Sequence, residues 1–204
     1  MQEMKVRLTL TNEALGTLSG NPKIAEEYIA SKHPDGLQPD ELAQLVKLEE
    51  LQEKQSTVFP KDDTGCPFVW GYQFKGFLKE ACLAMIESDE ETAATLKLRR
   101  LTLYLHKRTI DKQIFMAERF CVIDMKGGEM GWCERPLRGQ TMKGERISLA
   151  RSETVPEGST FEFTILVNNK KLVPYIKKWL DYGQFSGFLQ WRNSGKGTFT
   201  YEIL

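Results

Sequence analysis

Strict alternation of apolar and polar residues marks two segments of this chain. Val6, Leu8 and Leu10 alternate with polar residues near the N-terminus, and the same period of two returns over 161–167. Because successive side chains of a strand point to opposite faces, each segment predicts a strand with one buried face. Residues 199–204 predict a closing strand.

Helical spacing of apolar residues is most regular between residues 74 and 86. Positions three and four apart share one face of a helix, so this spacing predicts a buried face made by Phe74, Phe77, Leu78, Ala81, Cys82, Met85 and Ile86. A second stripe predicts a helix before the closing strand, and it comprises Leu172, Val173, Ile176, Trp179 and Leu180. A further strand is predicted by the alternating Leu101, Leu103 and Leu105, with a partner strand in 114–123.

Two helices are expected in the acidic segment that follows the first strand. Asn21 can cap a helix whose first turn takes Pro22. The inward stripe of that helix is expected to consist of Ile24, Tyr28 and Ile29. A second helix over 39–53 is expected to turn inward Leu42, Leu45, Val46 and Leu51. Residues 12–55 are therefore interpreted as an acidic helical insertion.

The predicted elements fit one α+β domain over 1–204, with a polar, basic excursion over 124–152. A hydrophobic fraction of 41% supplies a substantial core. The chain has no run of about 18 apolar residues, so a membrane span is not expected. Its four cysteines are isolated, without the paired spacing of a zinc site, and Cys82 falls on a core face. We expect a cytoplasmic protein without metal or cofactor.

Charge is balanced overall but unevenly distributed. Residues 1–65 carry 12 acidic and 7 basic side chains, a net charge of −5. Residues 131–204 carry 7 acidic and 11 basic side chains, a net charge of +4. Such an imbalance favours a polyanion but is also common on solvated surface. Basic residues with few acids between them fill the excursion, namely Arg135, Arg138, Lys143, Arg146 and Arg151.

A glycine-rich loop precedes the closing strand. Its glycines are Gly183, Gly187, Gly195 and Gly197, and they allow a close approach of the backbone to another surface. An aromatic ring, two cations, an amide and a hydroxyl accompany them, a combination that suits a phosphate or a base. These residues are Trp191, Arg192, Asn193, Ser194 and Lys196. The alternative is a glycine-rich hairpin that only turns the chain.

Three segments together resemble the RAMP superfamily. GCPFVWGYQFKGFLKEAC resembles its signature, in which a Gly-x-x-x-Lys-Gly step, here Gly71, Lys75 and Gly76, opens the first helix. Residues 153–167 resemble its Pro-x-Gly-x-x-Phe strand, and SGKGTF at 194–199 resembles its glycine-rich loop. The resemblance covers about two-thirds of the chain and leaves out 12–55. As a whole sequence, the chain is also similar to phage and prophage proteins.

The resemblance implies an RNA-recognition-motif-like or ferredoxin-like antiparallel sheet with helices on one face, a helical insertion and a thumb-like hairpin. RAMP proteins include the backbone subunits of CRISPR effector complexes, which polymerise along guide RNA. Lys75, at a helix N-terminus, would then contact phosphate, unless Gly71 and Gly76 serve only close packing. In the thumb, phosphates would be tracked by Arg135, Arg138, Lys143 and Arg146. Met142 or Leu137 could wedge between bases.

Catalysis is not expected. Some RAMP subunits cut RNA with an aspartate, and ungapped placement puts Gln55 near that position, with Glu53 as a weak candidate. Asp62 and Asp63 belong to the predicted PKDDTG turn. RAMP nucleases that process precursor RNA rely on a histidine. Of the two histidines here, neither His33 nor His106 shows a positioned partner for general acid–base work.

The leading hypothesis is a non-catalytic protein that binds single-stranded RNA or DNA, with RNA the better fit. It could assemble as a homo-oligomer along the strand or with CRISPR effector subunits. A phage-encoded interaction module, a decoy with anti-CRISPR activity, is the alternative that the acidic 12–55 insertion motivates. An endoribonuclease is the third hypothesis.

Overall fold

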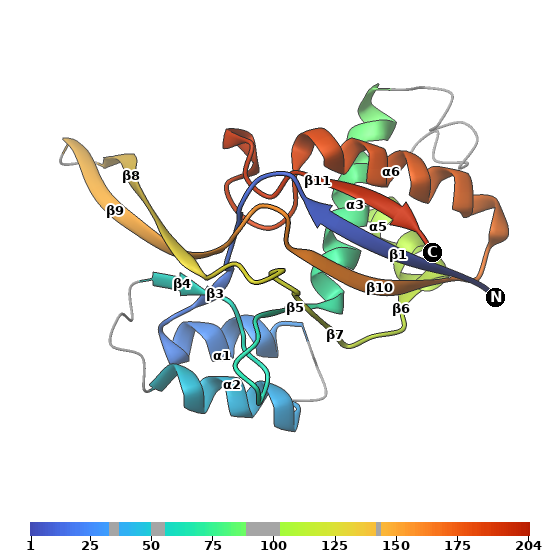
Figure 1. Cartoon of the computed structure of the whole chain (residues 1–204). Helices are drawn as coiled ribbons and strands as arrows, with labels where there is room; N and C mark the ends of the chain where they lie inside the picture. The colour runs from blue at the N-terminus through green and yellow to red at the C-terminus, as the bar shows by residue number, and fades with distance from the viewer. Residues whose placement is uncertain (33–36, 50–55, 89–102, 142–143) are drawn as a thin grey trace.

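A four-stranded antiparallel sheet forms the centre of the molecule (Figure 1). The computed structural model describes residues 1–32, 37–49, 56–88, 103–141 and 144–204. In spatial order the strands of this sheet are β11 (Phe199–Ile203), β1 (Gln2–Leu10), β10 (Thr160–Val167) and β6 (Ile114–Met116). Along the chain the main elements are β1, α3 (Gly71–Ser88), β6, β10, α6 (Val173–Ser186) and β11. This βαββαβ order confirms the predicted ferredoxin-like fold.

The alternating segments form the central strands as predicted. In β1 the side chains of Val6, Leu8 and Leu10 are buried, and in β10 every second residue from Phe161 to Val167 is buried. The helices α3 and α6 lie on the side of the sheet to which these side chains point (Figure 1). The hydrophobic alternation therefore decided which face of the sheet the helices cover.

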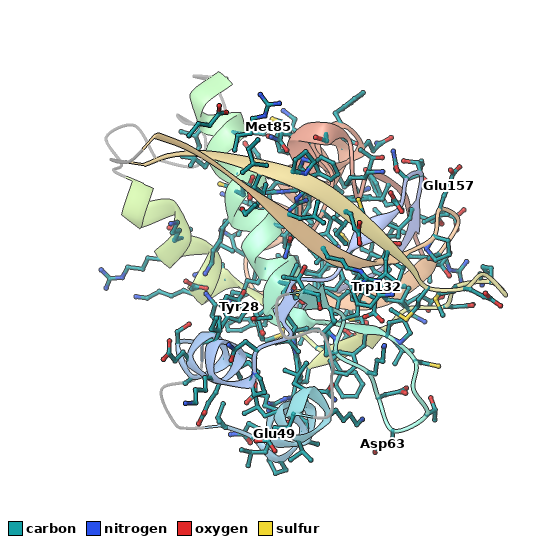
Figure 2. The ribbon with its side chains drawn as sticks, turned by 90° about the vertical axis from the view of Figure 1, so that its left-hand side faces the viewer. Tyr28, Glu49, Asp63, Met85, Trp132 and Glu157 are labelled. Atoms are coloured by element: carbon teal, nitrogen blue, oxygen red, sulfur yellow. The ribbon has the colours of Figure 1, made fainter. Side chains whose placement is uncertain are left out.

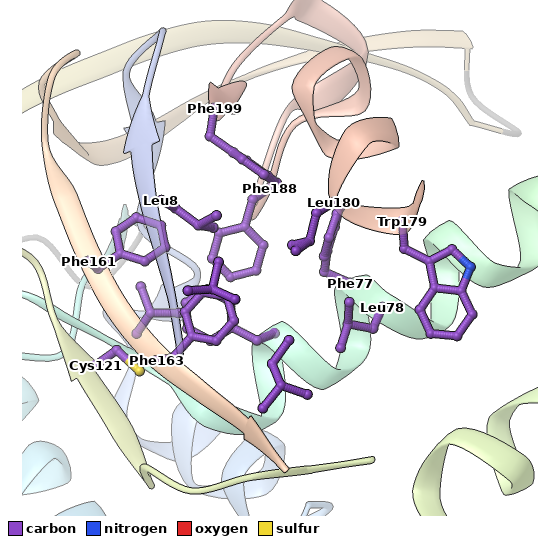
Figure 3. Close-up of a cluster of buried hydrophobic side chains, with 14 of the residues drawn as sticks. Leu8, Phe77, Leu78, Cys121, Phe161, Phe163, Trp179, Leu180, Phe188 and Phe199 are labelled. Carbon is purple, nitrogen blue, oxygen red and sulfur yellow. The ribbon is translucent and has the colours of Figure 1, made fainter. Parts of the chain in front are cut away.

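Aromatic rings hold α3 against the sheet. Phe74 of α3 lies 4.2 Å, centroid to centroid, from Phe163 of β10 and 4.7 Å from Phe188, which follows α6. Figure 3 shows Phe163 and Phe188 in this cluster, together with Phe77 and Phe199. The predicted stripes of α3 and α6 are confirmed as core. Burial raises the pKa of the Cys82 thiol, on that stripe, to about 12.

The predicted strand around Leu103 is wrong. Residues Leu103–Gln113 form a helix, α5, and Leu101 lies outside the described residues. Three alternating leucines fit a strand only over a short window. Over a longer window, Leu103, Ile110 and Ile114 are seven and four residues apart, which is helical spacing. Lys79 and Lys75 of α3 attach α5 through ion pairs with Asp111.

The segment 114–123 forms two short strands in different sheets. β6 pairs with β10, whereas β7 (Phe120–Val122) pairs with β5 (Phe68–Trp70). The carboxylate of Glu118 accepts hydrogen bonds from the amide and the hydroxyl of Thr164. Beyond the end of β6, the Glu118 side chain thus accepts a β10 backbone hydrogen bond that a neighbouring strand would otherwise accept.

The insertion contains α1 (Pro22–Ala30) and α2 (Pro39–Glu49), and Asn21 caps α1 as predicted. The predicted inward faces are partly wrong. Ile24 and Val46 are 55% and 60% exposed. Tyr28 and Leu42 also point outward, Leu51 lies outside the described residues, and the buried positions are Ala25, Ile29, Glu41, Gln44 and Leu48.

Polar anchoring explains the rotated face of α2. The buried carboxylate of Glu41 pairs with Arg119 at 3.1 Å and accepts the amide hydrogen of Gln38. The side-chain amide of Gln44 exchanges two hydrogen bonds with the backbone of Lys61. Polar side chains with partners of this kind can occupy inward positions that periodicity alone assigns to leucine and valine.

The excursion forms a long antiparallel hairpin, β8 (Gly131–Thr141) and β9 (Gly144–Val155), that extends from the body of the molecule (Figure 1). Its base belongs to a second sheet that also contains β2 (Ala14–Leu15), β3 (Leu18–Ser19) and β4 (Ser56–Val58). At this base the carboxylate of Glu153 pairs with Lys61 at 2.7 Å and accepts the amide hydrogen of Phe59.

Short 3₁₀ turns, η1 (Lys170–Leu172) and η2 (Arg192–Ser194), flank α6.

Among the described helices, none combines the length and the apolar character that crossing a membrane requires.

We expect Phe74→Ala to lower the free energy of unfolding by about 3–5 kcal/mol, because it removes a ring that packs between α3, β10 and Phe188. Urea denaturation followed by circular dichroism measures this change. Ile24→Ala, which truncates an exposed apolar side chain, serves as the control and should change stability by less than about 0.5 kcal/mol. Equal effects of the two substitutions would contradict the role given to the aromatic cluster.

Candidate nucleic-acid interface

The glycine-rich loop after α6 is a closed, tightly crossed segment. The amide of Phe188 donates to the carbonyl oxygen of Gly197 at 2.8 Å. A Cβ at Gly187 would lie 2.3 Å from the carbonyl oxygen of Lys196, and one at Gly197 would lie 2.0 Å from that of Phe188. Glycine is therefore required where the two arms of the loop touch. The expectation of a close backbone approach is confirmed, and the partner surface is the loop itself.

Two larger residues of this loop also adopt left-handed backbone conformations. Leu189 has φ of 71° and Trp191 has φ of 56°. Such values are uncommon outside glycine and persist where the surroundings enforce them. Phe188, directly before Leu189, is 2% exposed and stacked on Phe74, so it anchors this part of the loop to the core. The loop thus presents Trp191 in a set conformation.

The tertiary structure joins the hairpin to this loop. The guanidinium carbon of Arg135, on β8, lies 4.7 Å from the centroid of the Trp191 ring, within cation–π range. Its Nη2 donates to Oε1 of Gln190 at 3.3 Å. Its Nε and Nη1 are buried without a hydrogen-bond partner among the described residues. In the sequence, Arg135 and Trp191 are candidate binding residues of two separate segments, and Gln190 is not among the candidates.

Other cations of the predicted site carry partners. Arg192 pairs with Glu80 of α3 at 2.7 Å, and Lys196 pairs with Glu13. On the hairpin, Arg138 lies 4.0 Å from Glu145. The Arg138–Glu145 pair lies on exposed surface, where an ion pair contributes little, about 0–1 kcal/mol, so a phosphate can replace this carboxylate at modest cost. The half-buried pairs of Arg192 and Lys196 orient their cations.

Lys75 also has a carboxylate partner. It lies 3.2 Å from Asp111, and Lys79 lies 2.7 Å from the same carboxylate. Partial burial, the largest single influence, acts to raise the pKa of Asp111, but hydrogen bonds and charge from Lys79 and Lys75 outweigh it, and the pKa lies below its ordinary value. The two lysines thus share one negative charge, which leaves this part of α3 net positive.

The start of α3 is a packing contact. The amide of Gly71 donates to the carbonyl oxygen of Arg119 at 2.7 Å, and a Cβ at Gly71 would lie 2.5 Å from the carbonyl oxygen of Glu118. The amide of Trp70 is bonded to the side chain of Gln73. Close packing, the alternative considered for Gly71, thus accounts for this glycine, and phosphate contact by Lys75 stays a prediction.

A groove of about 720 Å³ connects the insertion to the glycine-rich loop along α3. Lys75 and Arg192 both line it, together with Glu80 and Asp111. Three further cations that sequence reasoning missed line the same groove, namely Lys32, Lys79 and Lys107. Five cations against two carboxylates make the groove basic. Trp191 and Asn193 line a neighbouring cavity of about 660 Å³ that shares Arg192 and Glu80 with the groove.

The hairpin separates the predicted thumb residues. Side chains alternate along a strand, so Arg135 and Arg138, three residues apart on β8, point to opposite faces. Arg138 pairs in register with Ile147, whereas Leu137 shares the face of Arg135. Figure 2 views the molecule with the hairpin in front of α3 and Trp132 near the hairpin base. Met142, Lys143 and the side chain of Arg146 lie outside the described residues.

Among the candidate residues for RNA cleavage, the structure assigns a role to Asp62. Asp62 accepts hydrogen bonds from the amides of Thr64 and Cys66, so it caps the turn as expected. The Thr64 hydroxyl, which also donates to this carboxylate, is the main cause of an Asp62 pKa below its ordinary value. Asp63 is solvent-exposed and lies 3.6 Å from Lys47. Outside the described residues lie His33, Glu53, Gln55 and the side chain of His106.

Comparisons with known proteins agree with the fold. No protein-family model matches the sequence, nor does any curated protein sequence. Among solved structures, the chain is similar to one in the cryo-EM structure of the Type III-B Cmr-beta complex bound to cognate target RNA, with a TM-score of 0.52 and 11% identity. The match covers 100% of this chain and 61% of the other chain, so this chain spans about three-fifths of its length. The likeness shows that the two chains share a fold, and it is consistent with the RAMP-like fold that the sequence motifs predict.

We expect Gly197→Ala to destabilise the protein more than Gly195→Ala. Both glycines have positive φ, so each alanine should cost about 1–2 kcal/mol of unfolding free energy in backbone strain. At Gly197 the new methyl group also meets the carbonyl oxygen of Phe188, whereas at Gly195 nothing lies within 4 Å. Thermal unfolding of the two variants measures the difference, and equal midpoints would contradict the crossed-loop description.

Proposed function

We propose that this protein is a non-catalytic binder of single-stranded nucleic acid, preferentially RNA, and that it assembles along the bound strand. The observation that carries the proposal is the contact between Arg135 and Trp191 beside a basic groove. The positive charge of the half-buried Arg135 suits a phosphate, and an aromatic ring suits a base. The RAMP-like fold supports RNA as the polymer, since the similar chain belongs to a complex bound to target RNA.

The groove supplies the electrostatic part of the binding. One of its cations, Lys32, follows the end of α1, and the others lie on α3, α5 and the glycine-rich loop. Phosphates that follow the groove would displace the counterions of the strand. Affinity should therefore fall as salt rises, with a slope of about −0.7 per phosphate contact on a log–log plot.

We expect Arg135→Gln to weaken binding of a labelled single-stranded RNA about tenfold in fluorescence anisotropy at low salt, since it removes both the charge and the ring contact. Arg151→Gln is the matched control. Arg151 also lies over a tryptophan, Trp132, at 4.4 Å, but it points to the other face of the hairpin. The control should change affinity by less than about twofold.

Two results would contradict this proposal. One is the absence of RNA binding by the unsubstituted protein at low salt. The other is an equal loss of affinity in Arg135→Gln and Arg151→Gln. The size-exclusion mass of the protein with and without RNA tests assembly, which predicts a larger, heterogeneous particle only when RNA is present.

The non-catalytic part of the proposal rests on the turn-capping role of Asp62. Labelled RNA incubated with the protein, with and without a divalent metal, should remain intact over many hours. Metal-dependent cleavage products that persist through further purification would replace this part of the proposal with an endoribonuclease.

A second candidate is a protein-interaction module, such as a phage-encoded decoy that acts on a CRISPR effector complex. The favouring observation is the outward apolar surface of the insertion, which includes Ile24, Leu42 and Val46. Leu42 and Val46, four residues apart, share one face of α2, and exposed apolar residues that gather on one face are typical of docking surfaces. Copurification with an effector subunit, with a 260-to-280 nm absorbance ratio typical of pure protein, would favour this function over RNA binding.

A further inference from the structure

Phe185, in the last turn of α6, is an aromatic side chain that the fold does not use. It is 84% exposed, the highest value among the large apolar side chains that the structure describes. The buried face of α6 is made by Ile176, Trp179, Leu180 and Gly183. The Phe185 ring therefore contributes little to the packing of the core and is open to a ligand.

Phe185 lines the cavity of about 660 Å³ that Trp191 also lines. Tyr182 adds a third aromatic ring from α6, and Asn193 and Arg192 add polar groups from the glycine-rich loop. Cavities of about 300–1,000 Å³ with aromatic walls and a few polar groups are typical of small-ligand sites. The aromatic and polar lining suits a nucleobase, for which the volume leaves ample room.

Of the aromatic rings around this cavity, that of Trp191 is positioned before any ligand arrives. The left-handed conformations at Leu189 and Trp191 set the direction of the indole ring, and the Arg135 guanidinium contacts that ring. A side chain that is already ordered loses little conformational entropy on binding. Strain concentrated in a loop that presents a ring to a cavity is characteristic of a binding site.

The polar groups around the cavity match a nucleotide. The side-chain amide of Asn193 can both donate to and accept from the edge of a base. Arg192, held by Glu80 at 2.7 Å, lines both this cavity and the basic groove. A strand whose phosphates follow the groove would therefore pass the mouth of the cavity.

We propose that this cavity binds one unpaired nucleobase of the strand, which stacks against the rings of Phe185 and Trp191 while Asn193 faces its edge. The site rests on the proposed binding of single-stranded nucleic acid and adds a base-stacking element to it. Base stacking on aromatic rings tolerates any sequence, because every base has a π-face. The site therefore predicts affinity for bases without a strong sequence preference.

The test compares two labelled strands of equal length in fluorescence anisotropy, an oligouridylate and its abasic analogue, which keeps the sugar–phosphate backbone. We expect Phe185→Ala to weaken binding of the oligouridylate about tenfold and to leave binding of the abasic strand within about twofold. Phe185→Tyr should retain the affinity, since it keeps an aromatic ring. Ile24→Ala, which truncates an exposed apolar side chain on α1, is the control and should affect neither strand.

The outcomes separate this inference from the proposed function. If the unsubstituted protein binds neither strand, the proposed function fails and the base site falls with it. If it binds the oligouridylate and Phe185→Ala binds that strand equally well, the base site is wrong and the proposed function stands. Equal losses on both strands would also overturn the site, because they would place Phe185 in contact with the backbone or in the fold. Circular dichroism of each variant checks the fold.

Discussion

The stacking of Phe188 on Phe74 is the contact on which the rest of the site depends. It joins the first residue beyond Gly187 to the first turn of α3, and Phe163 continues the stack into the sheet. With Phe188 fixed, the close approach at Gly197 closes the loop, and the left-handed backbone at Trp191 turns its ring toward Arg135. A core interaction thereby determines the geometry of a surface loop.

The second constraint is the anchoring of the insertion and the hairpin by ion pairs in which a buried carboxylate meets a half-exposed cation. Arg119 binds Glu41 of α2, and Lys61 binds Glu153 at the base of β9. Removing the cation is costly because the buried carboxylate is left without compensation. The hairpin therefore leaves the body in a defined direction, and Arg135 reaches the loop as a result.

Carboxylates orient the basic side chains of the groove. Glu80 and Asp111 orient Arg192, Lys75 and Lys79 while leaving a positive excess. Cations that are already oriented lose less conformational freedom when phosphates bind. The same arrangement explains how a chain with 28 acidic and 28 basic residues presents a basic surface along α3.

The ferredoxin-like order was implied by the resemblance of three motifs, whereas the central strands and the stripe of α3 followed from hydrophobic periodicity, which depends on local geometry. Periodicity failed at Leu103, where a short alternating run belongs to a helix, and on α2, where partners on other elements bury Glu41. Only the tertiary structure decided that Arg135 meets Trp191 and that Phe185 lines a cavity, since those residues lie on separate elements. Hydrophobic periodicity along the chain reports which residues of one element are buried, whereas a site is made by contacts between segments far apart in sequence.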